Sequence, residues 1–168
     1  MKRGHACRQT GFTLIETLVY LALYSVISLG MLTAVYSLLE SGAQNETIAM
    51  VEEEGDYLTG KIDASLAGAA SIESPTTSGT TLSVLGSDGS TVVIKSLASD
   101  ILLQEGNTAF QKLNNSNVTV SDLIFLHTPA IGSGSPAESV SASFTLSATT
   151  SDGHVLSRDF LTLKYLQI

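Results

Sequence analysis

The longest hydrophobic run in the chain lies near its start. Residues 17 to 39 contain no charged side chain and are rich in Leu, Val, Ile, Tyr and Ala. A helix of about 20 apolar residues crosses the roughly 30 Å hydrocarbon core of a bilayer. We therefore expect a membrane-spanning helix over residues 12–39, whose Tyr, Ser and Thr side chains indicate that it also packs against other helices. Gly30 marks a place where this helix can bend or unwind.

The next segment keeps a helical period but becomes amphipathic. Its apolar residues recur mostly three or four positions apart, and no proline occurs before Pro75. This spacing predicts that the helix continues over residues 40–72. The apolar positions of this face are Ile48, Val51, Leu58, Ile62, Leu66 and Ala69.

From residue 73 onwards the pattern changes to short alternating segments separated by turn residues. Ser87-Asp88-Gly89 and Glu105-Gly106-Asn107 each separate two such segments, which predicts two hairpins. Longer strands are expected in "NVTVSDLIFLHT", "SVSASFTLSAT" and "HVLSRDFLTLKYLQ". The expected fold class is α+β: a long N-terminal helix, transmembrane in its first half, packed against a C-terminal antiparallel β-sheet that forms a globular head over residues 73–168.

Charge is distributed unevenly along the chain. The formal net charge is −8, yet Lys2, Arg3 and Arg8 lie in the first ten positions. A basic tip before an apolar helix predicts a cytoplasmic tip and an exported head. The acidic remainder argues against direct nucleic-acid binding, which needs clustered Lys and Arg.

Residues suited to catalysis or metal binding are sparse. The single cysteine, Cys7, excludes an intrachain disulfide, and three histidines without further cysteines give no zinc-binding spacing. No Gly-x-Ser-x-Gly turn or phosphate-binding loop occurs. Asp88 and Asp152 precede glycines, where aspartate usually stabilises a turn. We expect neither an enzyme nor a cofactor or metal site.

Two simpler interpretations of the apolar run compete. A secretory signal peptide would have a shorter apolar core and a small-residue cleavage site, whereas "YSLLESGAQ" offers a mediocre one. A plain signal anchor fits the length, but it has no use for the carboxylate of Glu16 at the mouth of the run.

Glu16 belongs to a short motif with a known parallel. The order is a basic tip, Gly11, then Phe12-Thr13-Leu14-Ile15-Glu16 and the apolar run. It resembles the class III signal of type IV prepilins and pseudopilins. The resemblance implies a pilin-like fold and cleavage by prepilin peptidase between Gly11 and Phe12, which makes residues 1–11 a leader peptide. It also implies N-methylation of Phe12 and a role for Glu16 in assembly.

Electrostatics supports the role that the resemblance gives to Glu16. Cleavage would leave an ammonium group on Phe12 at the bilayer surface, four residues from Glu16. In a helical bundle the carboxylate can neutralise the amino terminus of a neighbouring subunit. The attraction between the two charges is stronger in a low-dielectric bundle than in water, and a charge left there without its partner is destabilising. Pairing would therefore check the register of assembly.

Three features favour a minor subunit over a major pilin. The chain has no cysteine pair near its C-terminus, and Thr33 stands in the region where major pilins commonly carry a helix-kinking proline. The segment around Val120, Leu123 and Phe125 resembles the "Val-x-x-Leu-x-Phe" strand of minor pilins and J-type pseudopilins.

These observations give an expected function and its alternatives. We expect a minor structural subunit of a type IV pilus-like or type II secretion pseudopilus fibre. The resemblance implies prepilin peptidase, other pilin or pseudopilin subunits and an inner-membrane assembly platform as partners. The chain would cross the bacterial inner membrane once, head outside the cytoplasm, before entering a periplasmic or cell-surface fibre. The alternatives are a competence (DNA-uptake) pseudopilin and a signal-anchored surface binding domain that does not polymerise.

Overall fold

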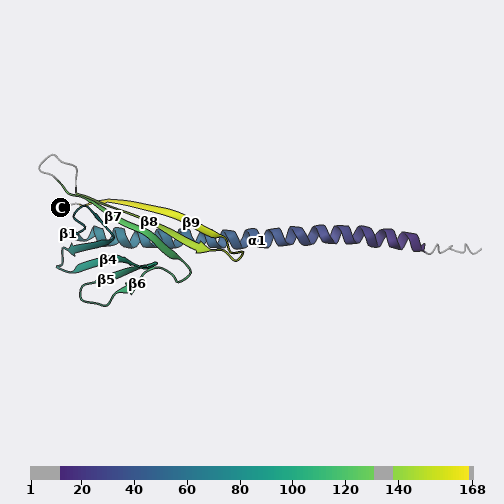
Figure 1. Cartoon of the computed structure of the whole chain (residues 1–168), viewed down its shortest axis with the longest axis horizontal. Helices are drawn as coiled ribbons and strands as arrows, with labels where there is room; N and C mark the ends of the chain where they lie inside the picture. The colour runs from purple at the N-terminus through teal and green to yellow at the C-terminus, as the bar shows by residue number, and fades with distance from the viewer. Residues whose placement is uncertain (1–11, 131–137, 167–168) are drawn as a thin grey trace, which may run out of the picture. The chain divides into compact units, whose positions relative to one another are not determined.

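The computed structural model describes residues 12–130 and 138–166 (Figure 1). It divides into two compact units, Met1–Gly42 and Ala43–Ile168. The expected leader, residues 1–11, lies outside the described residues, and Gly11 with it.

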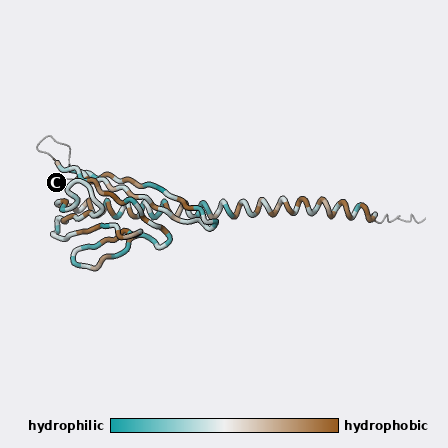
Figure 2. Tube along the Cα trace, viewed as in Figure 1, coloured by the Kyte–Doolittle hydropathy of each residue, from teal (hydrophilic) through white to brown (hydrophobic). Residues whose placement is uncertain are grey.

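The described part of the first unit is almost entirely helical. Helix α1 spans Leu14–Ala67, and its first part supplies this unit. Large apolar side chains in this unit, from Phe12 to Leu39, are at least half exposed. The backbone tube in Figure 2 is coloured predominantly as hydrophobic along this part of α1. The backbone stays helical through Gly30, so the described helix is not interrupted at the place where the sequence allowed a break.

The end of α1 corrects one expected boundary. The helix ends at Ala67 rather than at residue 72, and strand β1 (Ala69–Ser74) follows almost at once. The carbonyl of Gly68 accepts hydrogen bonds from the backbone N–H of Ser87 at 3.0 Å and from its hydroxyl at 3.3 Å. These bonds hold the chain where it leaves the helix, so Ala69 pairs with Gly86 on a strand instead of extending the helix.

The second unit contains two antiparallel sheets, where the sequence suggested one. One sheet has the order β1-β3-β4-β5-β6 and the other has the order β2-β7-β8-β9. The remaining strands are β2 (Ser78–Gly79), β3 (Thr81–Gly86), β4 (Thr91–Leu97), β5 (Asp100–Glu105), β6 (Gln111–Lys112), β7 (Thr119–Thr128), β8 (Ser139–Thr149) and β9 (Val155–Tyr165). The α+β class with one long helix and antiparallel strands is confirmed.

Local turn signals located the hairpins correctly. β3 pairs with β4 across the turn that contains Gly89, and β5 pairs with β6 beyond Gly106. Both glycines have positive φ angles, 83° and 58°, a conformation that costs glycine little and other residues more. β8 pairs with β9 along their whole lengths, which confirms the two C-terminal strands.

The core lies between the second part of α1 and the two sheets. On the helix side its buried residues are Val51, Leu58, Ile62 and Leu66, four of the six positions expected from the sequence. On β8 the buried set is the alternating series Val140, Ala142, Phe144, Leu146 and Ala148. A strand with every second side chain buried has one face on the core, as its sequence predicted.

Candidate functional site

The described start of α1 is capped by Thr13. Its backbone carbonyl accepts hydrogen bonds from the N–H groups of Glu16 at 3.1 Å and Thr17 at 3.2 Å. Its hydroxyl oxygen lies 3.4 Å from the same Glu16 nitrogen. The first N–H groups of a helix have no partner within the helix, and a threonine at this position supplies one. Thr13-Leu14-Ile15-Glu16 thus has the sequence of a capping box.

Glu16 is the acidic residue in the first turn of α1 and is half-buried. A negative side chain is favourable there because the helix dipole places partial positive charge at its N-terminus. The hydroxyl of Tyr20 donates a long hydrogen bond of 3.4 Å to Oε1 of Glu16. Within residues 12–130 and 138–166, no cation forms an ion pair with this carboxylate. Its acceptor capacity is therefore largely unused.

Phe12 stands just before the helix with 73% of its surface exposed. Its ring meets that of Tyr20 edge-on, with centroids 6.2 Å apart and an interplanar angle of 74°. Phe12 and Tyr20 also line a shallow groove with Thr17, Leu21 and Tyr24. Tyr20 therefore contacts both Phe12 and Glu16, two of the three residues singled out in the sequence. The third, Gly11, lies outside the described residues.

The helix that begins at this site is long and apolar enough to cross a membrane. Its most apolar stretch has a mean hydropathy of 2.0 and none of that stretch is buried in the structure. A signal sequence near the N-terminus can have the same length and composition. An exposed helix of membrane length and the capped carboxylate at its start are the features that the described first unit provides.

A second polar cluster lies in the head around His127. Nδ1 of His127 is 3.0 Å from the carbonyl oxygen of Pro75, and Nε2 is 2.8 Å from Oε1 of Glu138. A carbonyl oxygen only accepts, so Nδ1 is the hydrogen-bond donor to Pro75. The cluster joins the end of β7 to the residues before β2 and β8. Among the described residues, no third His, Cys, Asp or Glu joins this pair to form a metal site.

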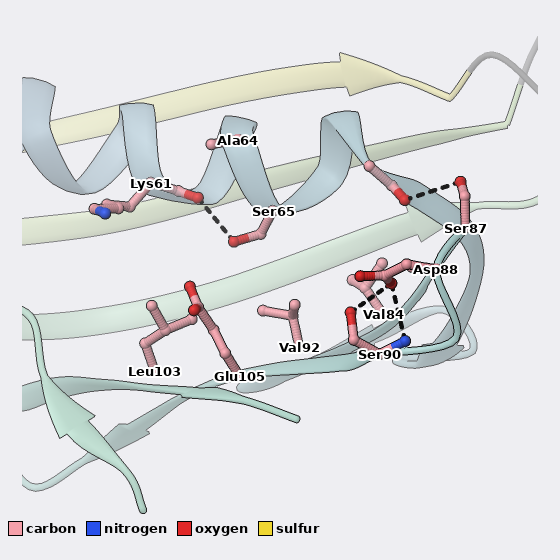
Figure 3. A pocket seen from close by; sticks show the side chains of 12 residues that line it. Lys61, Ala64, Ser65, Val84, Ser87, Asp88, Ser90, Val92, Leu103 and Glu105 are labelled. Atoms are coloured by element: carbon pink, nitrogen blue, oxygen red, sulfur yellow. Dashed lines mark hydrogen bonds between the residues drawn. The ribbon is translucent and has the colours of Figure 1, made fainter. Parts of the chain in front are cut away.

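A cleft opens between the last turns of α1 and the sheet that contains β3, β4 and β5 (Figure 3). Two of its serines are hydrogen-bonded locally: Ser65 donates to the carbonyl of Lys61, and Asp88 accepts from the hydroxyl of Ser90 at 2.6 Å and from its N–H at 2.9 Å. These two bonds, the hydroxyl first, lower the pKa of Asp88. These bonds account for a stable turn, and the side chains of Lys61 and Glu105 also line the cleft.

The potential metal ligands of the described chain are dispersed. In the parts of the chain that the structure describes, no group of three or more His, Cys, Asp or Glu side chains is placed to hold a metal ion. His154 lies 3.8 Å from Asp152 in an exposed turn. The remaining histidine, His5, and Cys7 lie outside the described residues.

Comparison with known proteins gives no assignment: no family model, no curated protein and no solved structure matches the chain. A function for the start of α1 therefore rests on its own residues.

The hydrogen-bond partners of Glu16 and His127 were not predicted from the sequence. The T-x-x-E spacing of Thr13 and Glu16, and the four-residue spacing of Glu16 and Tyr20, are local signals that could have indicated the cap and the hydroxyl donor. The pairing of His127 with Glu138 has no such signal, since eleven positions of sequence and a strand end separate the two residues.

Proposed function

We propose that this chain is a minor structural subunit of a type IV pilus-like or type II secretion pseudopilus fibre. It is inserted in the inner membrane, cut after Gly11, N-methylated on Phe12 and assembled through its N-terminal helix. The observation that carries the proposal is the carboxylate of Glu16 in the first turn of an exposed, membrane-length helix, without a cation among the described residues. The Gly11-Phe12 segment resembles a prepilin signal, and cleavage there would create a cation, the amino terminus of Phe12.

The chemistry of that cation follows from the cleavage. Hydrolysis of the Gly11–Phe12 peptide bond converts an amide nitrogen into an amino group, which N-methylation leaves basic and positively charged. The group lies one helical turn from Glu16 along the chain. In a bundle of subunits it is a suitable partner for the Glu16 carboxylate of a neighbour. Removing one partner of such a desolvated pair is strongly unfavourable, so correct register is selected.

The capping box supports one alternative function. Glu16 can be explained as a helix-start residue, held by Thr13 and Tyr20, in a signal-anchored surface domain that never polymerises. In that case the carboxylate stabilises only its own helix and needs no second subunit. The two functions differ in whether the negative charge of Glu16, rather than its hydrogen-bonding shape, is required.

A Glu16→Gln variant separates these functions because glutamine also fits a capping box but carries no charge. We expect native-membrane protein to begin at N-methylated Phe12, measured by intact mass and N-terminal sequencing. We expect Glu16→Gln to be processed normally yet to reduce assembly into sheared fibres by at least about tenfold, as loss of a desolvated ion pair predicts. Glu16→Asp, which keeps the charge, is the matched control.

Two results would contradict the proposal. A mature chain that retains Met1 or Lys2 would leave the signal-anchored domain. Normal assembly of the Glu16→Gln variant would show that the charge of Glu16 has no part in subunit contact.

A further inference from the structure

His127 links two segments of the head that are distant in the sequence. Its ring lies near the end of β7, with Nδ1 3.0 Å from the carbonyl oxygen of Pro75 and Nε2 2.8 Å from Oε1 of Glu138. We call these three residues the His127 clasp. The side chains of His127 and Glu138 are only 9% and 15% exposed, so water has little access to their contact.

The His127 clasp lies where the chain passes from one sheet to the other. Strand β1 ends at Ser74 in the first sheet and β2 begins at Ser78 in the second, so Pro75 belongs to the connection between them. The backbone N–H of His127 donates to the carbonyl of Thr77, in the same connection, at 2.7 Å. β2 pairs with β7 over only two residues and is an edge strand of its sheet. The clasp therefore holds a short edge strand in place.

The two ring contacts together need one proton more than a neutral histidine carries. Nδ1 donates to the carbonyl oxygen of Pro75, which only accepts. In a neutral imidazole Nε2 then offers a bare lone pair, and an ionised carboxylate also offers only lone pairs. Two acceptors 2.8 Å apart repel each other, so both contacts form together only with a proton between Nε2 and Glu138. The pair is equivalent to an imidazolium beside a carboxylate, whichever atom holds the proton.

Glu138 is the charged group that acts on this ring. Across the sheet His127 faces Val140 on β8, and Lys164 on β9 lies beyond Val140 in the same row. Glu73 on β1 is exposed and accepts a hydrogen bond from β3, and β2 has no titratable side chain. Among the described residues, no charge other than Glu138 forms an ion pair with the ring.

We propose that the His127 clasp is a proton-operated switch that closes when the ring is protonated and opens when it is neutral. A neutral ring has a single N–H. A carboxylate is a stronger acceptor than a carbonyl, so this N–H goes to Glu138 from Nε2 and leaves Nδ1 bare. Bare Nδ1 repels the carbonyl oxygen of Pro75, and the connection before β2 is released.

Opening has a structural consequence at the edge of the second sheet. β2 is held against Phe125 and Leu126 of β7 by two residue pairs and by the connection that the clasp secures. Release of the connection frees β2 and uncovers the hydrogen-bonding edge of β7. Histidine changes its charge between about pH 5 and about pH 8, so the edge is covered at acidic pH and uncovered as pH rises.

Nitrogen-15 NMR of the ring in the full chain, in detergent micelles, tests the switch. His5→Gln and His154→Gln leave His127 as the only histidine. At about pH 5 we expect both ring nitrogens to be protonated, and at about pH 8.5 only Nε2. Relative to its intrinsic rate, the His127 amide should then exchange with solvent at least about tenfold faster, as loss of a hydrogen bond to a charged ring predicts.

Glu138→Gln separates a switch from a merely structural contact. A glutamine amide both donates and accepts, so it can bond to Nε2 whether that atom is protonated or bare. We expect the His127 amide of this variant to stay equally protected from exchange at both pH values. Glu73→Gln, the same change at an exposed carboxylate on β1, is the control and should keep the pH dependence. Circular dichroism first shows that each variant is folded.

The proposal is overturned if the His127 ring keeps one protonation state at both pH values, or if its titration leaves exchange of the His127 amide unchanged. It is also overturned if folded Glu138→Gln loses protection with rising pH as the parent chain does. If Glu138→Gln does not fold, the titration of the parent chain decides. These measurements involve neither cleavage after Gly11 nor a fibre, so they are independent of the proposed function.

Discussion

Gly55 shows how one residue of α1 sets the distance between helix and sheet. A Cβ atom at this position would lie 2.0 Å from Cζ of Phe160 on β9. The Phe160 ring in turn stacks on Phe144 of β8, with centroids 5.5 Å apart. Helix propensity alone would make a glycine here merely unfavourable. The structure shows that the missing side chain makes room for an aromatic ring.

Substitution of Gly55 should therefore destabilise the head. The alanine of Gly55→Ala has a higher helix propensity than glycine, which favours folding by up to about 1 kcal/mol. Overpacking a close-packed core costs about 1–3 kcal/mol. Because the added carbon would overlap the Phe160 ring, we expect the overpacking to outweigh the propensity. We expect a lower free energy of unfolding, measured by urea-dependent pulse proteolysis of the detergent-solubilised chain. Gly60→Ala, with nothing within 4 Å of the added carbon, is the matched control and should be neutral or stabilising. If Gly55→Ala were more stable than the unmodified chain, the close packing of Phe160 against Gly55 would be wrong.

Asp122 explains an irregular spacing in β7. Val120, Leu123 and Phe125 are all buried, although residues an odd number apart on a regular strand face opposite ways. The register against β8 shifts between Ser121 and Ile124, and Asp122 has a positive φ of 54°. A bulge adds one residue to β7 at this point, so the side chains of Val120 and Leu123 can face the same side. The "Val-x-x-Leu-x-Phe" spacing was visible in the sequence, but the bulge that accommodates it was not.

At the scale of elements, three aspartates stabilise the connections between strands. In Asp88 the pKa is lowered by the hydroxyl and then the N–H of Ser90. In Asp100 it is lowered by hydrogen bonds from the Lys112 ammonium, at 2.8 Å, and then from the Asn114 amide. In Asp152 the hydroxyl of Thr150 has the same effect. Each partner favours the ionised carboxylate.

These shifts have a definite sign for stability. A carboxyl whose pKa is lower in the folded state stabilises the fold fully above its unfolded value of about 3.9, and this contribution is lost as pH falls through the folded pKa. We expect the combined Asp88→Asn, Asp100→Asn and Asp152→Asn variant to lose less thermal stability between about pH 5 and about pH 3 than the unmodified chain.

The measurement is the midpoint of thermal unfolding followed by circular dichroism at both pH values. Asp56→Asn, which removes a carboxyl from the exposed side of α1, is the control and should keep the steeper acid dependence. An equally steep dependence in the triple variant would show that the turn aspartates are not the cause.

Elements with local signals were predictable, and those defined by distant partners were not. The hairpin of β3 and β4 follows from alternation around an Asp-Gly turn, and β8 follows from its apolar period. β1 was missed because "AASIES" carries weak strand propensity and becomes a strand by pairing with β3. The division into two sheets depends on which strands become neighbours, such as β2 beside β7, and no local pattern specifies that choice.

At the scale of the whole molecule, the buried core belongs to the second unit. Among the described residues, every buried hydrophobic side chain lies between Val51 and Leu166. The second unit begins earlier, at Ala43. The first unit thus contributes exposed apolar surface and no part of this core.

A fragment that starts at Ala43 should therefore fold without detergent. We expect residues 43–168 to be soluble and to unfold cooperatively, because the fragment retains the complete core. A fragment that starts at Asp56 lacks the buried Val51 and also Gly55, against which the Phe160 ring packs. We expect this fragment not to fold. Gel filtration and circular dichroism distinguish the two fragments. A disordered 43–168 fragment would show that the first unit is needed for the fold.

The candidate site was predictable to the extent that it is a local motif. Phe12 and Glu16 were identified from five consecutive residues before an apolar run. Tyr20 entered only with the structure, since a tyrosine in a membrane-length helix has many possible roles. His127 and Glu138 could not be paired from sequence, because their contact depends on β7 and the residues before β8 lying side by side.

The free edge of strand β9 affects how the second unit behaves when it is separated from the first. It is an unbroken strand of 11 residues and pairs with β8, while its other edge has no neighbour among the described residues. Leu161, Leu163 and Tyr165 point outward from it and are exposed. An open, regular and apolar edge is a template on which further strands can add. Sheet growth of this kind needs two molecules to meet, so we expect the separated second unit to lose solubility as its concentration rises.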